Sequence, residues 1–318
     1  MKEKKRPFII IAGPTAVGKT ELSIALAKKI NGEIISADSM QVYKYMDIGS
    51  AKIMPEEMEG IRHYLIDELS PEEEFHIYRF RQMADAALEE IYNKGKIPII
   101  VGGTGFYIQA LLYQIDFTEV SSDESFRKEM EDFAKTYGAD ALHEKLKNID
   151  PESYETIHAN NTKRVIRALE FYHQNGYPIS RHNAIEKQKE SPFHFAYFVL
   201  TDERQYLYHR IEKRVDLMME KGLLEEVSQL KNRGYNKNMV SMQGLGYKEL
   251  FDYLDGICSL EEAVARIKIE TRHFAKRQLT WFRREKDCIW LNKEEYGRDN
   301  DRIMEEICRI LKEKEIVC

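Results

Sequence analysis

Residues 8–20 read Phe-Ile-Ile-Ile-Ala-Gly-Pro-Thr-Ala-Val-Gly-Lys-Thr, and this stretch decides the fold that the sequence predicts. Its apolar first part, residues 8–12, is typical of a buried strand, and residues 13–20 match the pattern G-x-x-x-x-G-K-[ST]. Residues 21–30 then place Leu22, Leu26 and Ile30 on one helical face. A strand, a glycine-rich turn and a helix in this order predict a phosphate-binding loop rather than an ordinary turn.

The chemistry of such a loop assigns a role to each residue type. Its backbone N–H groups surround a phosphate at the helix N-terminus, Lys19 neutralises the negative charge, and the Thr20 hydroxyl can ligate Mg²⁺. The pattern does not say which phosphorylated molecule is bound. The predicted phosphate loop consists of Gly13, Pro14, Thr15, Ala16, Val17, Gly18, Lys19 and Thr20.

Composition limits the class of protein. The chain has 318 residues, of which 43% are hydrophobic and 32% charged, as expected for a globular protein of more than one domain. No apolar run is long enough for a membrane span, so we expect a cytoplasmic protein. The four cysteines lack a C-x-x-C pair, which argues against a zinc site. The net charge of −6 argues against wholesale binding of polyanions, so a nucleic-acid site requires local clusters of basic residues.

A carboxylate follows the second predicted strand, residues 33–37, in the sequence Asp38-Ser39-Met40-Gln41. Ligands of open parallel sheets gather beyond the carboxyl ends of the strands, so Asp38 should face the same crevice as the phosphate loop. Asp38 is a candidate general base. The alternative is that it binds a magnesium-bound water or caps a helix.

A second glycine-rich turn, Gly102-Gly103-Thr104-Gly105, follows the predicted strand at residues 97–101. Two such turns in one sheet can direct backbone donors and the Thr104 hydroxyl at one anionic ligand. The alternative is a tight turn that needs glycine for its shape alone. Further strands are predicted at 63–67, 193–200 and 288–291, and helices at 75–93, from the capping box Ser259-Leu260-Glu261-Glu262, and at 301–314.

Residues 119–192 read as charged helices without strands, and we expect them to form an inserted helical domain. Residues 1–118 and 193–318 then form the core domain, with a C-terminal helical part. Ser121-Ser122-Asp123 has the composition of a helix cap. The insertion carries a basic cluster, for which the alternative is a solvated helix face, at Lys163, Arg164 and Arg167.

Two further basic regions follow. Arg210 and Arg214 lie four residues apart on one predicted helix face, and one of them could clamp a diphosphate. Residues 271–286 form the local basic cluster that the net charge requires, with Trp281 and Phe282 among its cations. Such aromatics can stack on unpaired bases, and the alternative is that both are core residues.

Five motifs together resemble one family, the bacterial tRNA dimethylallyltransferases, also called tRNA isopentenyltransferases. The motifs occur at residues 13–20, 38–43 (Asp-Ser-Met-Gln-Val-Tyr), 102–107 (Gly-Gly-Thr-Gly-Phe-Tyr), 243–248 (Gln-Gly-Leu-Gly-Tyr-Lys) and 276–283 (Lys-Arg-Gln-Leu-Thr-Trp-Phe-Arg). The resemblance implies an α/β fold, a P-loop NTPase-like parallel sheet flanked by helices with an inserted all-helical domain. It implies transfer of a dimethylallyl group from dimethylallyl diphosphate to N6 of adenosine 37, in tRNAs that read codons beginning with U.

The same resemblance implies where the substrates bind. The phosphate loop would hold the diphosphate with Mg²⁺ at Thr20, Asp38 would take the amine proton, and Lys19, Thr104 and Arg214 would stabilise the leaving group. We expect a monomer that binds the tRNA anticodon stem-loop and no membrane. The implied tRNA contacts are Asp38, Ser39, Met40, Gln41, Thr104, Arg127, Lys163, Arg164, Arg167, Gln243, Gly246, Lys248, Lys276, Arg277, Gln278, Trp281 and Arg283.

Two other functions share some of these features. A phosphate-loop kinase for a small molecule or nucleoside would have the same fold and could use Asp38 as its base. It would need an arginine-rich lid over the γ-phosphate, which the sequence lacks, and would leave the C-terminal basic stretch without a purpose. A non-catalytic nucleotide switch that binds nucleic acid would not need a carboxylate in the crevice.

Overall fold

The computed structural model describes residues 5–116 and 123–317, which form two compact units. The first unit comprises Met1–Leu112 and Pro192–Cys318, and the second comprises Tyr113–Ser191. Residue 119, where the sequence predicted the start of the insertion, lies outside the described residues.

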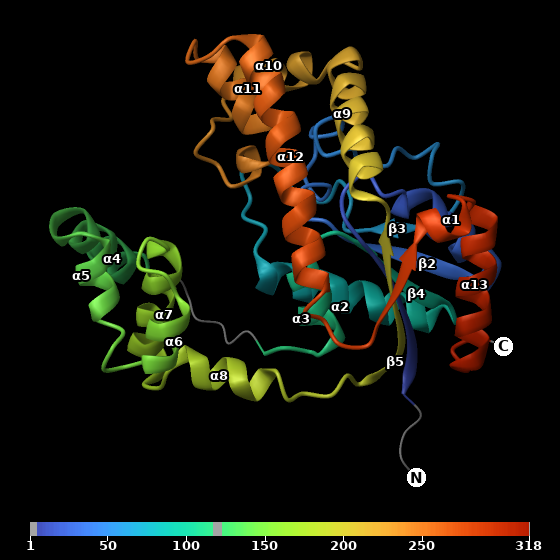
Figure 1. Cartoon of the computed structure of the whole chain (residues 1–318), viewed down its shortest axis with the longest axis horizontal. Coiled ribbons are helices and arrows are strands. Elements are labelled where there is room, and N and C mark those ends of the chain that lie inside the picture. The colour runs from blue at the N-terminus through green and yellow to red at the C-terminus, as the bar shows by residue number, and fades with distance from the viewer. Residues whose placement is uncertain (1–4, 117–122, 318) are drawn as a thin grey trace. The chain divides into compact units, whose positions relative to one another are not determined.

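The first unit is built on a six-stranded sheet with the order β3-β2-β4-β1-β5-β6 (Figure 1). Every pair of neighbouring strands is parallel. This arrangement confirms the predicted fold class. The strands are β1 (Arg6–Ala12), β2 (Gly32–Ala37), β3 (His63–Tyr64), β4 (Ile97–Gly102), β5 (Phe193–Thr201) and β6 (Cys288–Asn292).

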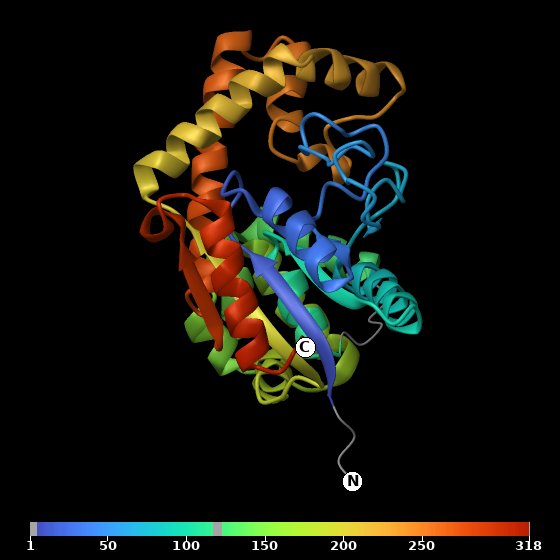
Figure 2. The same cartoon turned by 90° about the vertical axis from the view of Figure 1, so that its right-hand side faces the viewer.

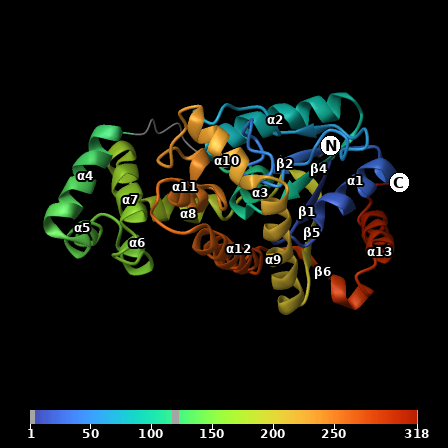
Figure 3. The same ribbon diagram turned by 90° about the horizontal axis from the view of Figure 1, so that it is seen from above.

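Helices cover both faces of this sheet, which explains why its central strands are apolar on both sides (Figure 3). Helices α1 (Lys19–Ile30) and α13 (Asn300–Glu313) pack on the face that carries Ile9 and Ile11. Helices α2 (Ile77–Asn93) and α3 (Gly105–Leu112) contact β2 and β4 and lie on the other face.

A helical part of the first unit stands beyond the carboxyl ends of the strands (Figures 1 and 2). The capping box that the sequence predicted begins its longest helix, because Ser259 and Glu262 bond each other's backbone N–H groups. Each α-helix of this part contacts at least two of the others. The members of this part are α9 (Arg204–Glu220), α10 (Leu223–Asn232), the 3-10 turn η1 (Ser241–Gln243), α11 (Tyr247–Leu254) and α12 (Leu260–Phe282).

The second unit contains only helices among its described residues. Its own apolar core includes Leu142, Leu146 and Val165. Asp123 caps the first of these helices by accepting a hydrogen bond from Phe126 N, whereas Ser121 and Ser122 lie outside the described residues. The helices are α4 (Glu124–Tyr137), α5 (Ala139–Glu144), α6 (Pro151–Thr156), α7 (Thr162–Asn175) and α8 (Ile179–Glu186).

Two remaining sequence features can be located. Within residues 5–116 and 123–317, every helix is too short or too polar to cross a membrane. Cys258, Cys288 and Cys308 are free thiols. Cys318 lies outside the described residues. The second 3-10 turn of the first unit, η2 (Lys293–Tyr296), directly follows β6.

Candidate active site

A cavity of about 180 Å³ lies at the carboxyl ends of β1, β2 and β4. The phosphate loop, residues 13–20, borders it after β1, Asp38 borders it after β2, and Gly102 and Gly103 border it at the end of β4. Helix α9 contributes Arg210 and Arg214. The sheet therefore brings both predicted glycine-rich turns and the predicted carboxylate to one place, as the strand order requires.

The phosphate loop has the backbone that its sequence predicts. Gly18 has a φ of 97° and precedes the first residue of α1, and Ala16 also has a positive φ, of 64°. Lys19 Nζ lies 2.9 Å from both Gly13 O and Pro14 O and donates to each. The pKa of Lys19 is lowered to about 8, chiefly by burial and further by the charge of nearby Arg214, while Asp38 opposes both effects. Lys19 thus holds its proton less firmly than an exposed lysine does.

The sequence analysis expected one of Arg210 and Arg214 to reach the diphosphate. Both residues border this cavity. Burial lowers the pKa of Arg214, and the charge of Arg210 adds to that effect while Asp38 opposes it. In the described part of the chain, neither guanidinium has an ion pair or a hydrogen-bond acceptor. Two clustered guanidinium groups with unused donors are suited to bind a phosphate-containing anion.

A fourth cation, Lys293, was missed by the sequence analysis. Its Nζ lies 3.1 Å from the position that a Cβ atom on Gly18 would occupy, and Arg210 Nη2 lies 3.9 Å from the same point. Lys293 is 5% exposed, and the only hydrogen bond that its side chain makes to a described residue is to the amide oxygen of Asn300, at 2.9 Å. Burial and the charge of Arg210 lower its pKa. Its place directly after β6, at the carboxyl edge of the sheet, was the signal that could have identified it.

Asp38 forms a tight turn at the cavity wall. Its Oδ1 atom accepts hydrogen bonds from Met40 N at 2.8 Å and Gln41 N at 3.4 Å. The other oxygen, Oδ2, has no hydrogen-bond partner within the described residues. The residues that follow Asp38 form turns and not a helix, so Asp38 is not the helix cap that the sequence left as an alternative, and Oδ2 stays available for chemistry.

Gln278 of α12 joins the two glycine-rich turns. Its Oε1 accepts from Thr15 N at 2.9 Å, and its Nε2 donates to Gly103 O at 3.0 Å. A Cβ atom on Gly103 would lie 2.0 Å from Gln278 Nε2, so glycine is needed for this close approach. Both polar atoms of the Gln278 amide are therefore bonded to the two turns. Its predicted contact with tRNA stays a prediction.

A second cavity of about 400 Å³ adjoins the first, and Thr15, Asp38 and Arg214 border both. It contains many of the residues that the resemblance assigns to tRNA. Gln41 instead borders the first cavity, where its Nε2 donates to Ala51 O at 3.2 Å. The predicted tRNA contacts that line the second cavity beside Asp38 are Ser39, Met40, Thr104, Gln243, Gly246, Lys248 and Arg277.

The remaining predicted tRNA contacts of the first unit lie on α12 and its end. Lys276 and Arg283 are exposed. Trp281 packs against α3, where its ring leaves no room for a Cβ atom on Gly105, and Phe282 is fully buried. Phe282 is thus a core residue, and stacking of Trp281 on a base stays a prediction.

In the second unit, a buried carboxylate holds two of the predicted arginines. Glu170 accepts from Arg127 Nε at 2.8 Å and from Arg167 Nη1 at 3.0 Å. The Glu170 side chain is fully buried, whereas the two guanidinium groups remain partly exposed. Lys163 and Arg164 are exposed on the same helix, α7.

Comparisons with known proteins identify the family. A family model described as IPP transferase matches residues 41–285, more than half of the chain. A curated relative from Lachnoclostridium phytofermentans, named tRNA dimethylallyltransferase, is 60% identical over 312 residues, which is 98% of this chain and 99% of the relative.

Solved structures are similar as well. The crystal structure of the full-length tRNA isopentenylpyrophosphate transferase from Bacillus halodurans has a TM-score of 0.73 and 44% sequence identity, with 98% of each chain covered. A eukaryotic dimethylallyltransferase acting on tRNA has a TM-score of 0.77 and 34% identity, with 90% of this chain and 74% of that chain covered.

Proposed function

The chain belongs to the IPP transferase family, and from that premise we propose that it is a tRNA dimethylallyltransferase. In this proposal the donor is dimethylallyl diphosphate, and the acceptor is N6 of adenosine 37 in tRNAs that read codons beginning with U. The observation that carries the proposal is the position of Asp38. It borders both the cavity that holds the cations and the cavity lined by the predicted tRNA contacts.

The first cavity suits a diphosphate. Lys19, Arg210 and Arg214 border it, and Lys293 lies at Gly18. Such cations stabilise the negative charge that grows on the oxygens of a departing diphosphate. Among the described residues that face Lys19 and Arg214, Asp38 is the acid that offsets their charge. The excess of positive charge favours a highly charged anion over a neutral ligand.

Magnesium fits the same place. Mg²⁺ prefers oxygen ligands, keeps several of its waters and is commonly shared with substrate phosphates. The Thr20 hydroxyl and the Asp38 carboxylate both border the first cavity, and the cavity leaves room for the remaining oxygens. When bound, the ion would neutralise part of the diphosphate charge. We propose Thr20 as its protein ligand.

The transfer then forms one bond and breaks another. The adenine N6 attacks C1 of the dimethylallyl group, the C1–O bond breaks, and diphosphate leaves with the bonding electron pair. An exocyclic adenine amine is a weak nucleophile, so removal of its proton as the C–N bond forms assists the reaction. Asp38 Oδ2 would accept that proton, because Oδ1 is engaged with the turn.

The second cavity would receive the acceptor base. A base inside a folded anticodon loop must leave its stack to reach an enclosed site, at a cost of a few kcal/mol. Contacts to the RNA backbone can offset this cost. We propose that Lys276, Arg283 and the second unit's Arg127 and Arg167 make such contacts. The monomeric state and the cytoplasmic location expected from the sequence stay predictions.

The test is an assay with purified protein, radiolabelled dimethylallyl diphosphate and unmodified tRNA. We expect label in the tRNA, at N6 of adenosine 37, with release of diphosphate. A parallel reaction contains ATP and candidate small acceptors without tRNA. ATP turnover there, together with unlabelled tRNA in the first reaction, would instead support the kinase.

A further inference from the structure

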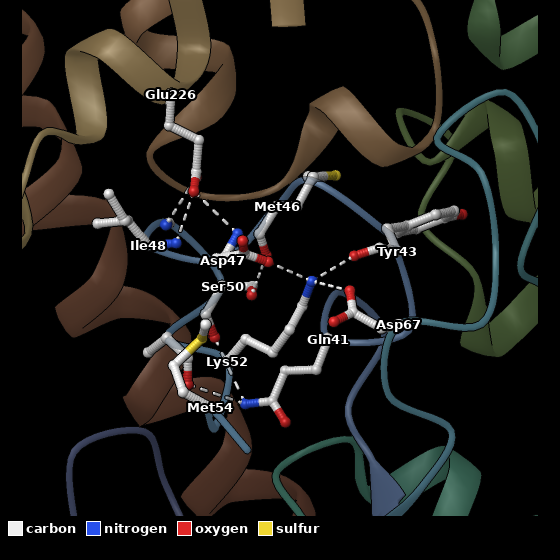
Figure 4. A network of polar contacts seen from close by, with 12 residues as sticks. Gln41, Tyr43, Met46, Asp47, Ile48, Ser50, Lys52, Met54, Asp67 and Glu226 are labelled. Carbon is white, nitrogen blue, oxygen red and sulfur yellow. Dashed lines mark hydrogen bonds and ion pairs between the residues drawn. The ribbon is translucent and has the colours of Figure 1, made fainter. Parts of the chain in front are cut away.

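Glu226 of α10 binds three consecutive backbone amides of a loop that is distant in sequence (Figure 4). Its carboxylate accepts from Asp47 N at 2.9 Å, Ile48 N at 2.7 Å and Gly49 N at 3.1 Å. Tyr247 of α11 donates its hydroxyl to the same carboxylate at 2.8 Å. Successive N–H groups that converge on one carboxylate form an anion-binding concavity, here filled by a side chain of the protein itself.

A buried lysine holds the opposite side of this loop (Figure 4). The Lys52 side chain is 1% exposed, and its Nζ donates to Tyr43 O at 2.7 Å and to Asp47 Oδ1 at 2.6 Å. It also forms an ion pair with Asp67. Asp47 is therefore held twice, by its backbone N–H at Glu226 and by its carboxylate at Lys52.

The loop held in this way leads directly to Asp38. We call residues 39–51 the cavity loop, because Ser39, Ser50 and Ala51 line the second cavity. The Gln41 amide donates to Ala51 O, and Gln41 N donates to Asp38 Oδ1. Hydrogen bonds thus connect Glu226, through the cavity loop, with the turn that orients the carboxylate of Asp38.

The cavity loop needs external support for its shape. Tyr45 and Ala51 have positive φ angles, of 68° and 48°, which L residues rarely adopt. A Cβ atom on Gly49 would lie 2.5 Å from the Tyr247 ring, so the loop is pressed closely against α11. The phosphate loop is held by other contacts, those of Gln278 and of β1 and α1.

We propose that Glu226 is a positioning residue for the transfer reaction: it fixes the cavity loop so that Asp38 meets the acceptor base, without contributing to the binding of diphosphate. This inference rests on the proposed function and adds to it a residue that touches neither substrate. The acceptor side and the donor side of the site are then supported separately, the first by Glu226 and the second by Gln278.

The test compares Glu226→Ala and Glu226→Gln with wild type. Single-turnover prenyl transfer is measured at saturating donor and tRNA, and binding of inorganic diphosphate is measured on the same samples. We expect the transfer rate of Glu226→Ala to fall about 10- to 100-fold, because small errors in alignment are costly. Glu226→Gln keeps one acceptor oxygen, so its transfer rate should fall less than that of Glu226→Ala. The diphosphate affinity should stay within about twofold of wild type in both.

Glu225→Gln is the matched control, since this exposed carboxylate precedes Glu226 on the same helix. Its transfer rate should equal that of wild type. Hydrogen exchange provides a readout that a general loss of stability would not reproduce. We expect faster exchange of the Asp47, Ile48 and Gly49 amides in Glu226→Ala, with the amides of α1 unchanged. Tyr247→Phe, which loses one of the four hydrogen bonds to Glu226 and also the hydrogen bond with the Ser50 backbone, is a second variant should Glu226→Ala fail to fold.

Two outcomes would overturn the proposal. One is a folded Glu226→Ala, or Tyr247→Phe in its place, that transfers at the wild-type rate. The other is a parallel loss of transfer and of diphosphate affinity, which would show a general structural role. A wild-type protein that transfers no prenyl group is a different result, because it contradicts the proposed function itself.

Discussion

Lys19 needs its proton to bind a diphosphate, yet its surroundings disfavour that proton. Its pKa is lowered to about 8 by burial and by Arg214. Below that pH the free protein already carries the charge, whereas above it binding must take up a proton. We therefore expect the affinity for inorganic diphosphate to fall as the pH rises through about 8.

Binding isotherms between pH 6 and 10 check this expectation, with Lys19→Met as the control. The control should bind more weakly at every pH and lack the inflection, which separates Lys19 from the titration of diphosphate itself. A wild-type inflection that persists in Lys19→Met would contradict the assignment.

Lys293 gives a second prediction for a single residue. Burial of a charged ammonium group costs free energy, and the neutral amide of Asn300 offsets little of that cost. A bound anion would offset more of it. We expect Lys293→Met to weaken diphosphate binding about tenfold, or roughly 1.4 kcal/mol, while the free protein unfolds at a temperature no lower than wild type. Isothermal titration and thermal unfolding measure the two effects.

Lys29→Met serves as its control because Lys29 is exposed on α1. An unchanged diphosphate affinity in Lys293→Met would remove Lys293 from the binding site. Unfolding at a much lower temperature would show that the residue acts in folding.

At the scale of elements, α12 holds the two glycine-rich turns together through Gln278. The Gln278→Ala change leaves Thr15 N and Gly103 O without these partners, and each buried polar group left unpaired costs about 1–3 kcal/mol. We expect a free energy of unfolding lower by about 2 kcal/mol and weaker diphosphate binding, since the phosphate loop loses its support.

Urea denaturation and diphosphate titration measure the two effects of Gln278→Ala. Thr280→Ala, at an exposed position on α12, is the control and should behave like wild type. A stability and an affinity equal to those of wild type would show that α12 does not support the turns.

These contacts also show which features of the structure could be predicted from the sequence. The strands, the two turns and Asp38 were predictable, because each depends on local pattern and on the rule that ligands collect at the carboxyl edge of a parallel sheet. Gln278 lies 263 residues from Thr15, and Glu226 lies 179 residues from Asp47. Their partners are set by the packing of α9–α12, which no local pattern determines. Lys293 lies between these cases, because the strand before it was predicted but the 3-10 turn that begins with Lys293 was not.

For the whole molecule, the net charge of −6 makes local basic surfaces necessary for tRNA binding. Arg283 is exposed just beyond α12, where it could pair with a backbone phosphate. We expect Arg283→Ala to weaken tRNA binding and to lower the slope of log K against log salt by about 1, because one phosphate contact is lost.

Filter binding or fluorescence titration at several salt concentrations measures that slope. Diphosphate affinity should not change, and Arg302→Ala, on α13, is the control. An unchanged salt slope would exclude Arg283 from the tRNA interface.

The measurement that tests the central claim most directly is single-turnover transfer by Asp38→Asn. Asparagine keeps an oxygen for the hydrogen bonds from Met40 N and Gln41 N, so the turn should persist while the base is lost. With bound diphosphate and bound tRNA at wild-type affinity, we expect the transfer rate to fall about 10²- to 10⁴-fold. Transfer at nearly the wild-type rate would show that Asp38 does not take the proton.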